Sequence, residues 1–576
     1  MTGSDYTVGD YLAARLAEAG VNHVFGVPGD YTLALLDHVI ASSSLRWVGC
    51  TNELNAGYAC DGYARIRGIG ALMTTFGVGE LSAVNAVAGS YAEHVPVVHI
   101  VGSPASGTQA AHRIVHHSLG DGVFTHFLEM HQPITCARAA LTPDNAVSEI
   151  DRVLTTVRGE HLPGYILLPA DVAGAPARPP GAALPVPSGA TDRVSLDGFV
   201  AAARRLIESA AGVQDVRVLG GLLVHRLGAI AELEALLRAG PLVHATSLWG
   251  KSLVDESDPW FAGVYVGAAS DEEARRAVED APVLILAGVQ FTDLNSGFFT
   301  QQITRTRTIE IGGASSSVGA ALFGPIALPA ALAALIPLIE EMARRAPGSA
   351  GSPRARPGVP RDPREGASQE PPDGAPLTQT SLWDTVAAFL RPHNVVLADQ
   401  GCSFYGAATH RLPGDVIFIG QPLWASIGYT LPALLGACLA RPASRGVLLI
   451  GDGAAQMTVQ ELSTVVREGI APLVVVVDND GYTVERAIHG PDQPYNDIAR
   501  WDWTSALSTF APGHACLSAR VGSVAELRAA LAEAESRPQR PAIIQAVVPR
   551  LDVPPLLAAL ARAAASANAR RSGANG

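Results

Sequence analysis

Short apolar runs alternate with amphipathic helical stretches along almost the whole 576-residue chain, and this alternation constrains the fold more than any other feature. Strands that are apolar at nearly every position and separated by helices are typical of a parallel sheet covered on both faces. The sequence therefore predicts an α/β protein with doubly wound, mainly parallel sheets. The expected strands are residues 21–27, 71–75, 97–101, 217–219, 241–245, 283–287, 308–311, 395–398, 446–450, 473–477 and 542–547.

Two proline-rich segments divide this pattern into thirds. Residues 176–188 are rich in Pro and Ala, and residues 345–378 are richer still in Pro, Gly and charge, as expected of an exposed linker. The composition of residues 566–576 predicts a frayed tail. We therefore expect three doubly wound domains, at residues 1–180, 190–344 and 379–565.

An uncharged run at residues 311–339 is long enough to cross a bilayer. It contains Pro325, Pro329 and Pro337, and a proline inside a helix costs about 3 kcal/mol or more. We expect a buried strand, a loop and a short helix here, and no membrane span.

The bulk composition limits the class of partner and the compartment. A net charge of -13 argues against nucleic acid, because phosphate binding is dominated by Lys and Arg. Only 16% of residues are charged, which suits a protein that buries surface between subunits. The six cysteines form no CxxC pair, and the first twenty residues show no signal-peptide core, so a reducing cytoplasm is expected.

Polar residues follow two neighbouring strands of the last third. Gly451, Asp452 and Gly453 come directly after the strand at 446–450, and Asn479 and Gly481 follow the strand at 473–477. Ligands of doubly wound sheets bind outside the carboxyl ends of the strands, and hard oxygen ligands suit Mg²⁺. Glycine amides there can hold a diphosphate. A GDG turn alone is a weak signal, but the GDG and NDG pair separated by one βαβ unit is specific.

This pair resembles the cofactor-binding motif of thiamine-diphosphate enzymes. Four further segments resemble pyruvate decarboxylase and its relatives, and the likeness is closest to the indolepyruvate, phenylpyruvate and branched-chain 2-keto acid decarboxylases. These segments are FGVPGDY (25–31), NELNAGYACDGYAR (52–65), TTFGVGELSAVNAVAGSYAEHVPVVHIVG (74–102) and QPLWASIGYTLPALLGA (421–437). The resemblance implies a pyrimidine-binding first domain, a last domain that binds diphosphate and Mg²⁺, and decarboxylation of a 2-keto acid to an aldehyde.

The resemblance also assigns cofactor contacts. Asp452, Asn479 and Gly481 would bind Mg²⁺. Glu53 would hydrogen-bond the pyrimidine, although the residues alone favour a capping or salt-bridged glutamate. Ile427 would force the bent cofactor shape, a proximity effect. The full expected set of cofactor contacts is Glu53, Val78, Gln400, Ala425, Ile427, Gly451, Asp452, Gly453, Ala454, Asn479, Gly481 and Tyr482.

Four titratable residues are expected to move protons in the later steps of the reaction, which needs acids tuned near neutral pH. They are Asp30, His116, His117 and Glu485. Asp30 is equally well placed to cap a helix. The adjacent histidines are absent from benzoylformate decarboxylase and acetolactate synthase, so they favour the pyruvate decarboxylase group.

Pocket residues implied by the resemblance bear on the substrate. Leu294, Gln400, Phe404 and Val484 are expected to line it, and the first three favour a medium-to-large aliphatic or aryl 2-keto acid over pyruvate. Ala425 stands where relatives carry Gly, and its methyl group is expected to narrow the pocket.

Alternative functions remain open from the sequence. Pyruvate decarboxylation and acyloin-forming carboligation use the same cofactor chemistry. A non-catalytic paralogue should have lost at least one of Asp30, Glu53, His117 and Glu485, and none is lost. A nicotinamide oxidoreductase is disfavoured because no GxGxxG follows a strand. The family implies a homodimer or homotetramer with each active site between subunits, so that Glu53 and Glu485 come from different chains.

Overall fold

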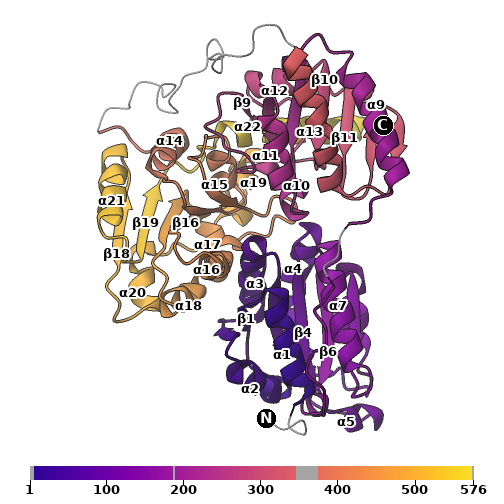
Figure 1. Ribbon diagram of the computed structural model, residues 1–576. Coiled ribbons are helices and arrows are strands. Elements are labelled where there is room, and N and C mark those ends of the chain that lie inside the picture. The colour runs from indigo at the N-terminus through magenta and orange to yellow at the C-terminus, as the bar shows by residue number, and fades with distance from the viewer. Residues whose placement is uncertain (1–5, 186–188, 346–373, 574–576) are drawn as a thin grey trace.

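The computed structural model describes residues 6–185, 189–345 and 374–573, and these form three mainly parallel sheets flanked by helices (Figure 1). The first sheet has the strand order β2-β1-β3-β4-β6-β5 and is parallel throughout. Its strands are β1 His23–Gly26, β2 Arg46–Gly49, β3 Gly70–Thr75, β4 Val97–Ser103, β5 Ala137–Ala140 and β6 Gly164–Pro169. Its helices are α1 Val8–Ala19, α2 Leu33–Ala41, α3 Glu53–Arg67, α4 Val78–Ala92, α5 Ser106–Ala110, α6 His126–Met130, α7 Ala146–Glu160 and α8 Ala170–Ala173.

The central sheet has the order β13-β12-β11-β10-β7-β8-β9, with an antiparallel hairpin at one edge. Its strands are β7 Val216–Gly220, β8 Val243–Ser247, β9 Phe261–Tyr265, β10 Val283–Ala287, β11 Thr308–Ile311, β12 Ser316–Val318 and β13 Ala321–Phe323. Its helices are α9 Arg193–Ile207, α10 Leu222–Arg226, α11 Ile230–Arg238, α12 Glu272–Glu279 and α13 Leu328–Arg345.

The third sheet has the order β15-β14-β16-β17-β19-β18 and is parallel throughout. Its strands are β14 Val395–Ala398, β15 Ile417–Ile419, β16 Gly446–Gly451, β17 Leu473–Asp478, β18 Leu517–Val521 and β19 Ala542–Val547. Its helices are α14 Gln379–Phe389, α15 Cys402–Ala407, α16 Thr430–Ala440, α17 Asp452–Thr458, α18 Leu462–Arg467, α19 Thr483–His489, α20 Ala506–Phe510, α21 Val524–Ser536 and α22 Pro555–Gly573. The predicted class, three mainly parallel α/β units, is confirmed.

Local differences from the sequence prediction have physical causes. The run 311–339 contains β12, β13 and an 18-residue helix α13 rather than one strand and a short helix. Pro337 lies inside α13, which is held by its buried face of Leu and Ile side chains against the central sheet. Tertiary packing thus outweighs the local cost of the proline. Among the described residues no helix is long and apolar enough to cross a membrane.

The predicted linker and tail also differ in part from the structure. Residues 346–373 of the linker lie outside the described residues, whereas Leu377 is buried and its N–H donates to the Gly522 carbonyl at 2.8 Å. Helix α22 continues to Gly573, through most of the segment expected to be frayed. After β16, helix α17 begins at Asp452, and a 3₁₀ turn at Val459–Glu461 separates it from α18.

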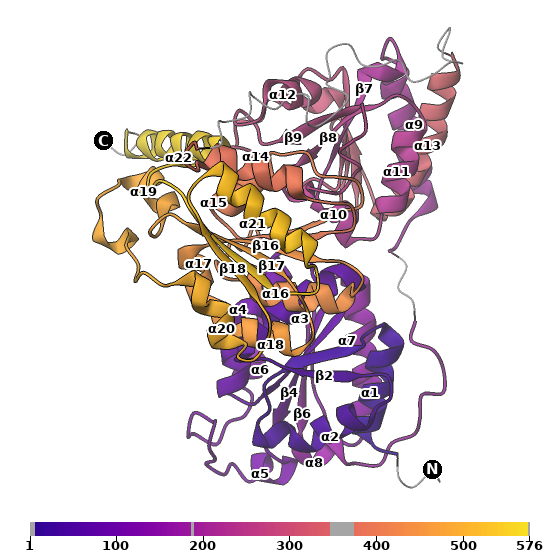
Figure 2. The ribbon, with the colours of Figure 1, turned by 90° about the vertical axis from the view of Figure 1, so that its left-hand side faces the viewer.

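Helices α3 and α16 pack against each other and join the first domain to the third (Figures 1 and 2). A Cβ on Gly436 would lie 1.8 Å from the Ala59 carbonyl oxygen, and one on Gly62 would lie 2.2 Å from the Ala433 carbonyl oxygen. Only glycine permits so close a crossing. The buried Tyr429 hydroxyl donates to the Asp61 carboxylate at 2.5 Å across the same contact.

Lys251, the only lysine of the chain, joins the central domain to the third. Its side chain is buried, and its Nζ donates to Glu256 Oε2 at 2.5 Å and to the His410 carbonyl at 2.5 Å. Glu256 also accepts the Leu412 N–H at 2.9 Å. Burial lowers the pKa of Lys251, and the Glu256 carboxylate opposes that shift.

Replacing Lys251 with Met should destabilise the protein by about 3–5 kcal/mol, because Glu256 would remain as a buried charge without its partner. Urea unfolding followed by fluorescence measures the change. Arg238→Met breaks an exposed ion pair with Glu234 and should cost less than about 1 kcal/mol. Equal losses of unfolding free energy in the two variants would show that the buried Lys251–Glu256 pair stabilises the protein no more than an exposed ion pair does.

Candidate active site

Asp30, His116 and His117 come together in the first domain. His116 Nε2 lies 2.7 Å from Asp30 Oδ2, and the rings of His116 and His117 meet edge to face with centroids 4.7 Å apart. The ligand-type atoms of the three residues lie within 4.8 Å of one another. Tyr31 stacks on His116 with a centroid distance of 4.9 Å. Three of the four residues predicted to move protons are therefore neighbours.

The backbone around His117 depends on a glycine. His117 has a φ of +64°, and its carbonyl oxygen lies against Gly77, where a Cβ would approach it to 2.0 Å. Gly77 itself has a φ of +64° and immediately precedes Val78, the first residue of α4. The close contact between Gly77 and the His117 carbonyl therefore fixes the histidine segment relative to Val78, an expected cofactor contact.

Glu53 is the first residue of α3, but it does not cap the helix. The Asn52 side chain is the cap and accepts the Asn55 N–H at 2.8 Å. Glu53 is half-buried and forms no ion pair among the described residues, and burial raises its pKa. Its Oε1 would lie 3.1 Å from a Cβ on Gly79, so its carboxylate adjoins the start of α4, where Val78 is 55% exposed. The cap of α3 is thus Asn52, and no ion pair explains the position of Glu53 among the described residues.

Glu80 lies in the first turn of α4, buried beneath the surface that carries Glu53 and Val78. It is fully buried, and it accepts the Gly77 N–H at 2.8 Å through Oε1 and the Tyr165 hydroxyl at 2.7 Å through Oε2. Burial raises the pKa of Glu80 to about 7, and the two hydrogen bonds oppose that shift. The buried His131 lies 3.9 Å from the same carboxylate. Glu80 was not predicted from the sequence, where it resembles any helix-starting glutamate.

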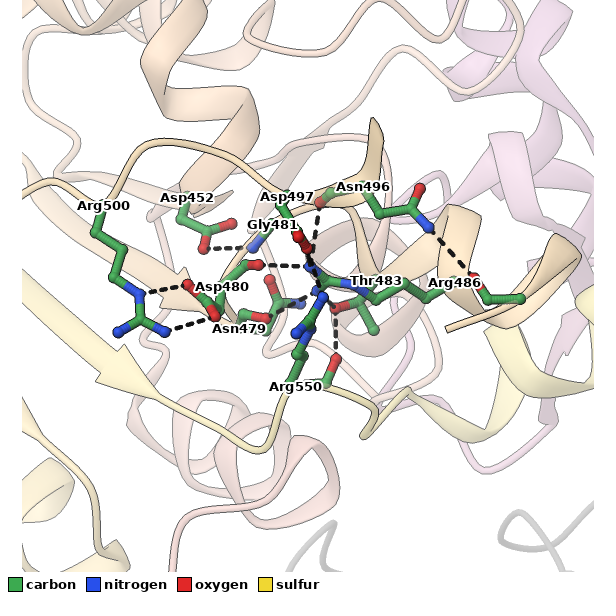
Figure 3. A network of polar contacts seen from close by, with 11 residues as sticks. Asp452, Asn479, Asp480, Gly481, Thr483, Arg486, Asn496, Asp497, Arg500 and Arg550 are labelled. Carbon is green, nitrogen blue, oxygen red and sulfur yellow. Dashed lines mark hydrogen bonds and ion pairs between the residues drawn. The ribbon is translucent and has the colours of Figure 1, made fainter. Parts of the chain in front are cut away.

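In the third domain, Asp452, Asn479 and Gly481 meet beyond the carboxyl ends of β16 and β17 (Figure 3). Asp452 Oδ2 accepts the Gly481 N–H at 3.1 Å, and Oδ1 accepts the Gly453 N–H at 2.7 Å. Burial raises the pKa of Asp452 to about 6. The adjacent strands β16 and β17 bring together residues that are 27 positions apart in sequence, as predicted.

One oxygen from each of these three residues lies in the same small space: Asp452 Oδ1, Asn479 Oδ1 and the Gly481 carbonyl oxygen. Asn479 Oδ1 lies 2.9 Å from the Gly481 carbonyl oxygen and 3.2 Å from Asp452 Oδ1, and it faces only acceptors. Its Nδ2 points instead to Cys402 Sγ at 3.8 Å. Rotating the amide would satisfy the contacts with hydrogen bonds, whereas the orientation present leaves three convergent acceptor oxygens. Three hard oxygen ligands suit Mg²⁺, which prefers six ligands and would leave its remaining coordination positions for phosphate and water.

The loops around this centre expose main-chain groups. A Cβ on Gly453 would lie 2.6 Å from the Tyr482 ring, so the ring covers that glycine closely. Gly451 has no atom within 4 Å of its Cβ position, and Ala454 is buried at the start of α17. This open glycine and the neighbouring amides fit a diphosphate group.

Ala425 and Ile427 lie in the segment that leads into α16. Ala425 has a φ of +58°, in the left-handed region that favours glycine. Its N–H donates to the Gln421 carbonyl at 2.8 Å, which helps to fix the turn. Ile427 is half-buried and packs against the core shared by the first and third domains.

The expected pocket residues do not all meet in one chain. Gln400 donates to the Tyr405 hydroxyl at 2.8 Å, and Val484 would lie 3.3 Å from a Cβ on Gly401. Phe404 instead is 1% exposed and lines a cavity of about 450 Å³ whose lining includes none of Leu294, Gln400 and Val484. Leu294 is half-buried in the central domain. Gln400 contacts Tyr405, which in turn packs against Phe404, and Val484 packs against the same hydrophobic cluster as Phe404.

Glu485 is exposed on α19, in the third domain. Helix α2, which follows the Asp30 turn in sequence and contacts it, stands at the end of the first domain remote from α19 in both views (Figures 1 and 2). The polar contacts of the described residues do not connect Asp30 or Glu53 with Asp452. One chain therefore carries two separate halves of the expected site.

Comparisons with known proteins cover all three domains. The chain matches the family models for the thiamine pyrophosphate enzyme N-terminal TPP binding domain (residues 6–126), central domain (200–336) and C-terminal TPP binding domain (399–546). Alpha-keto-acid decarboxylases of Mycolicibacterium paratuberculosis and Mycobacterium ulcerans are each 56% identical, over 97% and 96% of this chain and 96% and 95% of theirs.

A solved structure supports the fold separately. The thiamine diphosphate-dependent 4-hydroxybenzoylformate decarboxylase of Rhodococcus jostii RHA1 superposes with a TM-score of 0.74 and 18% identity, over 94% of this chain and 99% of that one. The chain therefore belongs to the thiamine pyrophosphate enzymes, and among them to the alpha-keto-acid decarboxylase family.

Replacing Glu80 with Gln should change how stability depends on pH. Because its pKa is raised from an ordinary 4.5 to about 7, the stabilising contribution of protonated Glu80 is full below pH 4.5 and is lost as pH rises through about 7. The loss amounts to about 3 kcal/mol by linkage. The stability of Glu80→Gln relative to wild type should therefore rise by that order between pH 5 and pH 8.

Urea unfolding of both proteins across this range measures the difference, in which other titrating groups cancel. Glu129→Gln, an exposed change in the same domain, is the matched control and should run parallel to wild type. A Glu80→Gln curve that also runs parallel would mean that Glu80 ionises normally.

Proposed function

We propose that this chain decarboxylates a medium-to-large aliphatic or aryl 2-keto acid, such as indolepyruvate, phenylpyruvate or a branched-chain keto acid, with thiamine diphosphate and Mg²⁺. The observation that carries the proposal is the paired arrangement of a titratable cluster at Asp30, His116 and His117 and a convergent oxygen site at Asp452, Asn479 and Gly481.

The third domain would hold the charged end of the cofactor. Asp452 Oδ1, Asn479 Oδ1 and the Gly481 carbonyl would bind Mg²⁺, and the open backbone at Gly451 would face the diphosphate. A bound cation would also favour the ionised form of Asp452, whose pKa burial otherwise raises to about 6. The first domain would hold the pyrimidine through Glu53 and Val78.

When bound, thiamine diphosphate supplies the electron sink that loss of carbon dioxide requires. Glu53 would hydrogen-bond the pyrimidine, and its raised pKa favours a carboxyl group that holds or shares a proton. Asp30 orients His116 through the 2.7 Å contact, and His116 adjoins His117. These groups can deliver a proton to the reacting carbon from one side, and Glu485 can act as an acid or base from the other.

The proton-delivering cluster favours decarboxylation over carboligation. Aldehyde release needs a proton at the former carbonyl carbon, whereas acyloin formation needs a second carbonyl there instead. Asp30, His116 and His117 offer three linked titratable groups on one surface. The aldehyde-forming reaction uses them directly.

A panel of 2-keto acids tests the substrate. With Mg²⁺ and thiamine diphosphate present, kcat/KM for phenylpyruvate, indolepyruvate or 2-ketoisocaproate should exceed that for pyruvate by at least about tenfold, because hydrophobic pockets discriminate at about 1–3 kcal/mol per methylene. Aldehyde release is followed by a coupled alcohol dehydrogenase. Pyruvate as the best substrate would overturn the size assignment, and acyloin as the main product would indicate the carboligase instead.

We also propose that the complete site forms between two chains. Helix α2, which contacts the turn that begins at Asp30, stands far from α19 within one chain (Figures 1 and 2). Large apolar side chains are exposed in the segments that carry the two expected halves. These exposed side chains are Val78, Trp424, Met457 and Ile488. Exposed apolar groups in this number are typical of a surface that another chain covers.

Mixing two inactive variants tests this arrangement. Glu53→Gln and Glu485→Gln should each lower kcat by at least about 100-fold without unfolding the protein, since each removes a group that moves a proton. A mixed dimer of the two should regain activity, because one of its sites contains both native glutamates. Failure of mixed dimers to regain activity, with mixing verified by mass spectrometry, would place both residues in one chain's site.

A further inference from the structure

Arg486 lies at the centre of the polar network around the Asp452 site (Figure 3). Its side chain is 1% exposed, and it projects from α19 toward the loop that follows β17. Nη1 donates to the Asn479 carbonyl at 3.2 Å and to Thr483 Oγ1 at 3.3 Å. Nη2 donates to the Asp480 carbonyl at 2.6 Å, the Asn496 carbonyl at 3.1 Å and Asp497 Oδ1 at 3.0 Å.

Three of these acceptors are main-chain carbonyls in two loops. The peptides of Asn479 and Asp480 belong to the turn that carries the expected cation ligands, and Asn496 belongs to a segment beyond α19. Buried carbonyls of this kind need a donor, because an unpaired one costs about 1–3 kcal/mol. The Asn496 carbonyl also accepts the Tyr482 N–H at 2.9 Å. The Arg486 guanidinium therefore supplies donors to the Asn479 and Asp480 carbonyls and adds a second connection between this turn and the Asn496 segment.

Gly481 is held against the same side chain. It has a φ of +120°, and a Cβ there would lie 2.2 Å from the Asn496 carbonyl oxygen and 2.9 Å from Arg486 Nη2. On its other side, the Gly481 N–H donates to Asp452. Gly481 thus sits between Arg486 and Asp452, and its carbonyl oxygen points to Asn479 Oδ1 at 2.9 Å.

The charge of Arg486 alone does not explain its position. A guanidinium repels a divalent cation, so a positive charge beside the cation ligands is electrostatically unfavourable unless its shape is required. Asp497 balances part of the charge and also accepts a bond from Arg550 at 2.5 Å. What arginine offers here is a rigid fork of five N–H donors, which lysine lacks.

We propose that Arg486 is a positioning residue for the divalent-cation site: it fixes the Asn479–Gly481 turn so that the side-chain oxygen of Asn479 and the carbonyl of Gly481 face the cation. This inference rests on the proposed function, in which Asp452, Asn479 and Gly481 bind Mg²⁺. It adds a role for a residue that contacts neither cofactor nor substrate.

Two variants separate the fork from the charge. Arg486→Lys keeps the charge and loses the fork, and Arg486→Met loses both. Arg500→Lys is the matched control. Arg500 donates two hydrogen bonds of 2.8 Å to the Asp480 side chain of the same turn, but its own side chain is 84% exposed. The full-length apoenzyme in its native oligomer is titrated with Mg²⁺ at saturating thiamine diphosphate, and binding is followed by tryptophan fluorescence without substrate.

The Kd for Mg²⁺ should rise at least about tenfold in both Arg486 variants and stay within about twofold of wild type in Arg500→Lys. At saturating Mg²⁺, Arg486→Lys should recover turnover to within about threefold of wild type, as a positioning role requires. Amide hydrogen exchange of residues 479–483 should be faster in both Arg486 variants before Mg²⁺ is added. Mg²⁺ affinity in Arg486→Lys equal to wild type would overturn the inference.

A second variant covers a folding failure. Asp497→Asn leaves Arg486 in place but weakens its anchor, and the Kd for Mg²⁺ should rise in the same direction by about threefold or more. An unchanged Kd there, with Arg486→Lys unfolded, would overturn the inference. Absence of Mg²⁺ binding by the wild type would overturn the proposed cofactor site together with this inference, whereas wild-type binding with unaffected Arg486 and Asp497 variants would overturn this inference alone.

Discussion

The close crossing of α3 and α16 is the contact on which the arrangement of the active-site halves depends. Gly62 and Gly436 let the two helix backbones approach so closely that a Cβ atom at either position would collide with a carbonyl oxygen of the other helix. The Tyr429–Asp61 hydrogen bond adds a buried polar contact there. Glu53 begins α3, and Ile427 lies just before α16. The same crossing that joins the first and third domains therefore fixes the positions of two expected cofactor contacts.

Each half of the expected site contains a glycine that lies so close to a carbonyl oxygen of another segment that no Cβ atom would fit. In the first domain, Gly77 meets the His117 carbonyl, and in the third, Gly481 meets the Asn496 carbonyl. Each crossing brings a functional segment from elsewhere in the chain onto the end of a sheet. Side chains alone hold such segments less tightly, because they retain rotamer freedom that backbone contacts lack. The buried Glu80 and Arg486 then fix the two crossings with hydrogen bonds to main-chain groups.

Residues that follow a local pattern could be predicted from the sequence, and residues defined by distant contacts could not. The strand and loop around Asp452 have a short-range signature, so their meeting with Asn479 was predictable from one βαβ unit. Glu80 and Arg486 look like ordinary helix residues, because their partners Tyr165 and Asn496 lie in other elements. The length of α13 was underestimated for the same reason. The helix continues past Pro337 because it packs against the central sheet, which the local sequence does not reveal.

The contact between the first and third domains also fixes the turn at Ala425. A residue with a Cβ in the left-handed region costs about 1–2 kcal/mol relative to glycine, so the turn must be held by its surroundings. Its neighbour Trp424 donates to Asn85 Oδ1 of the first domain at 2.7 Å, and Ser426 contacts the Tyr58 hydroxyl at 2.5 Å. These two cross-domain bonds flank Ala425 on either side. The Ala425 methyl group is therefore held in place by the first domain, and it cannot shift unless the contact between the domains also changes.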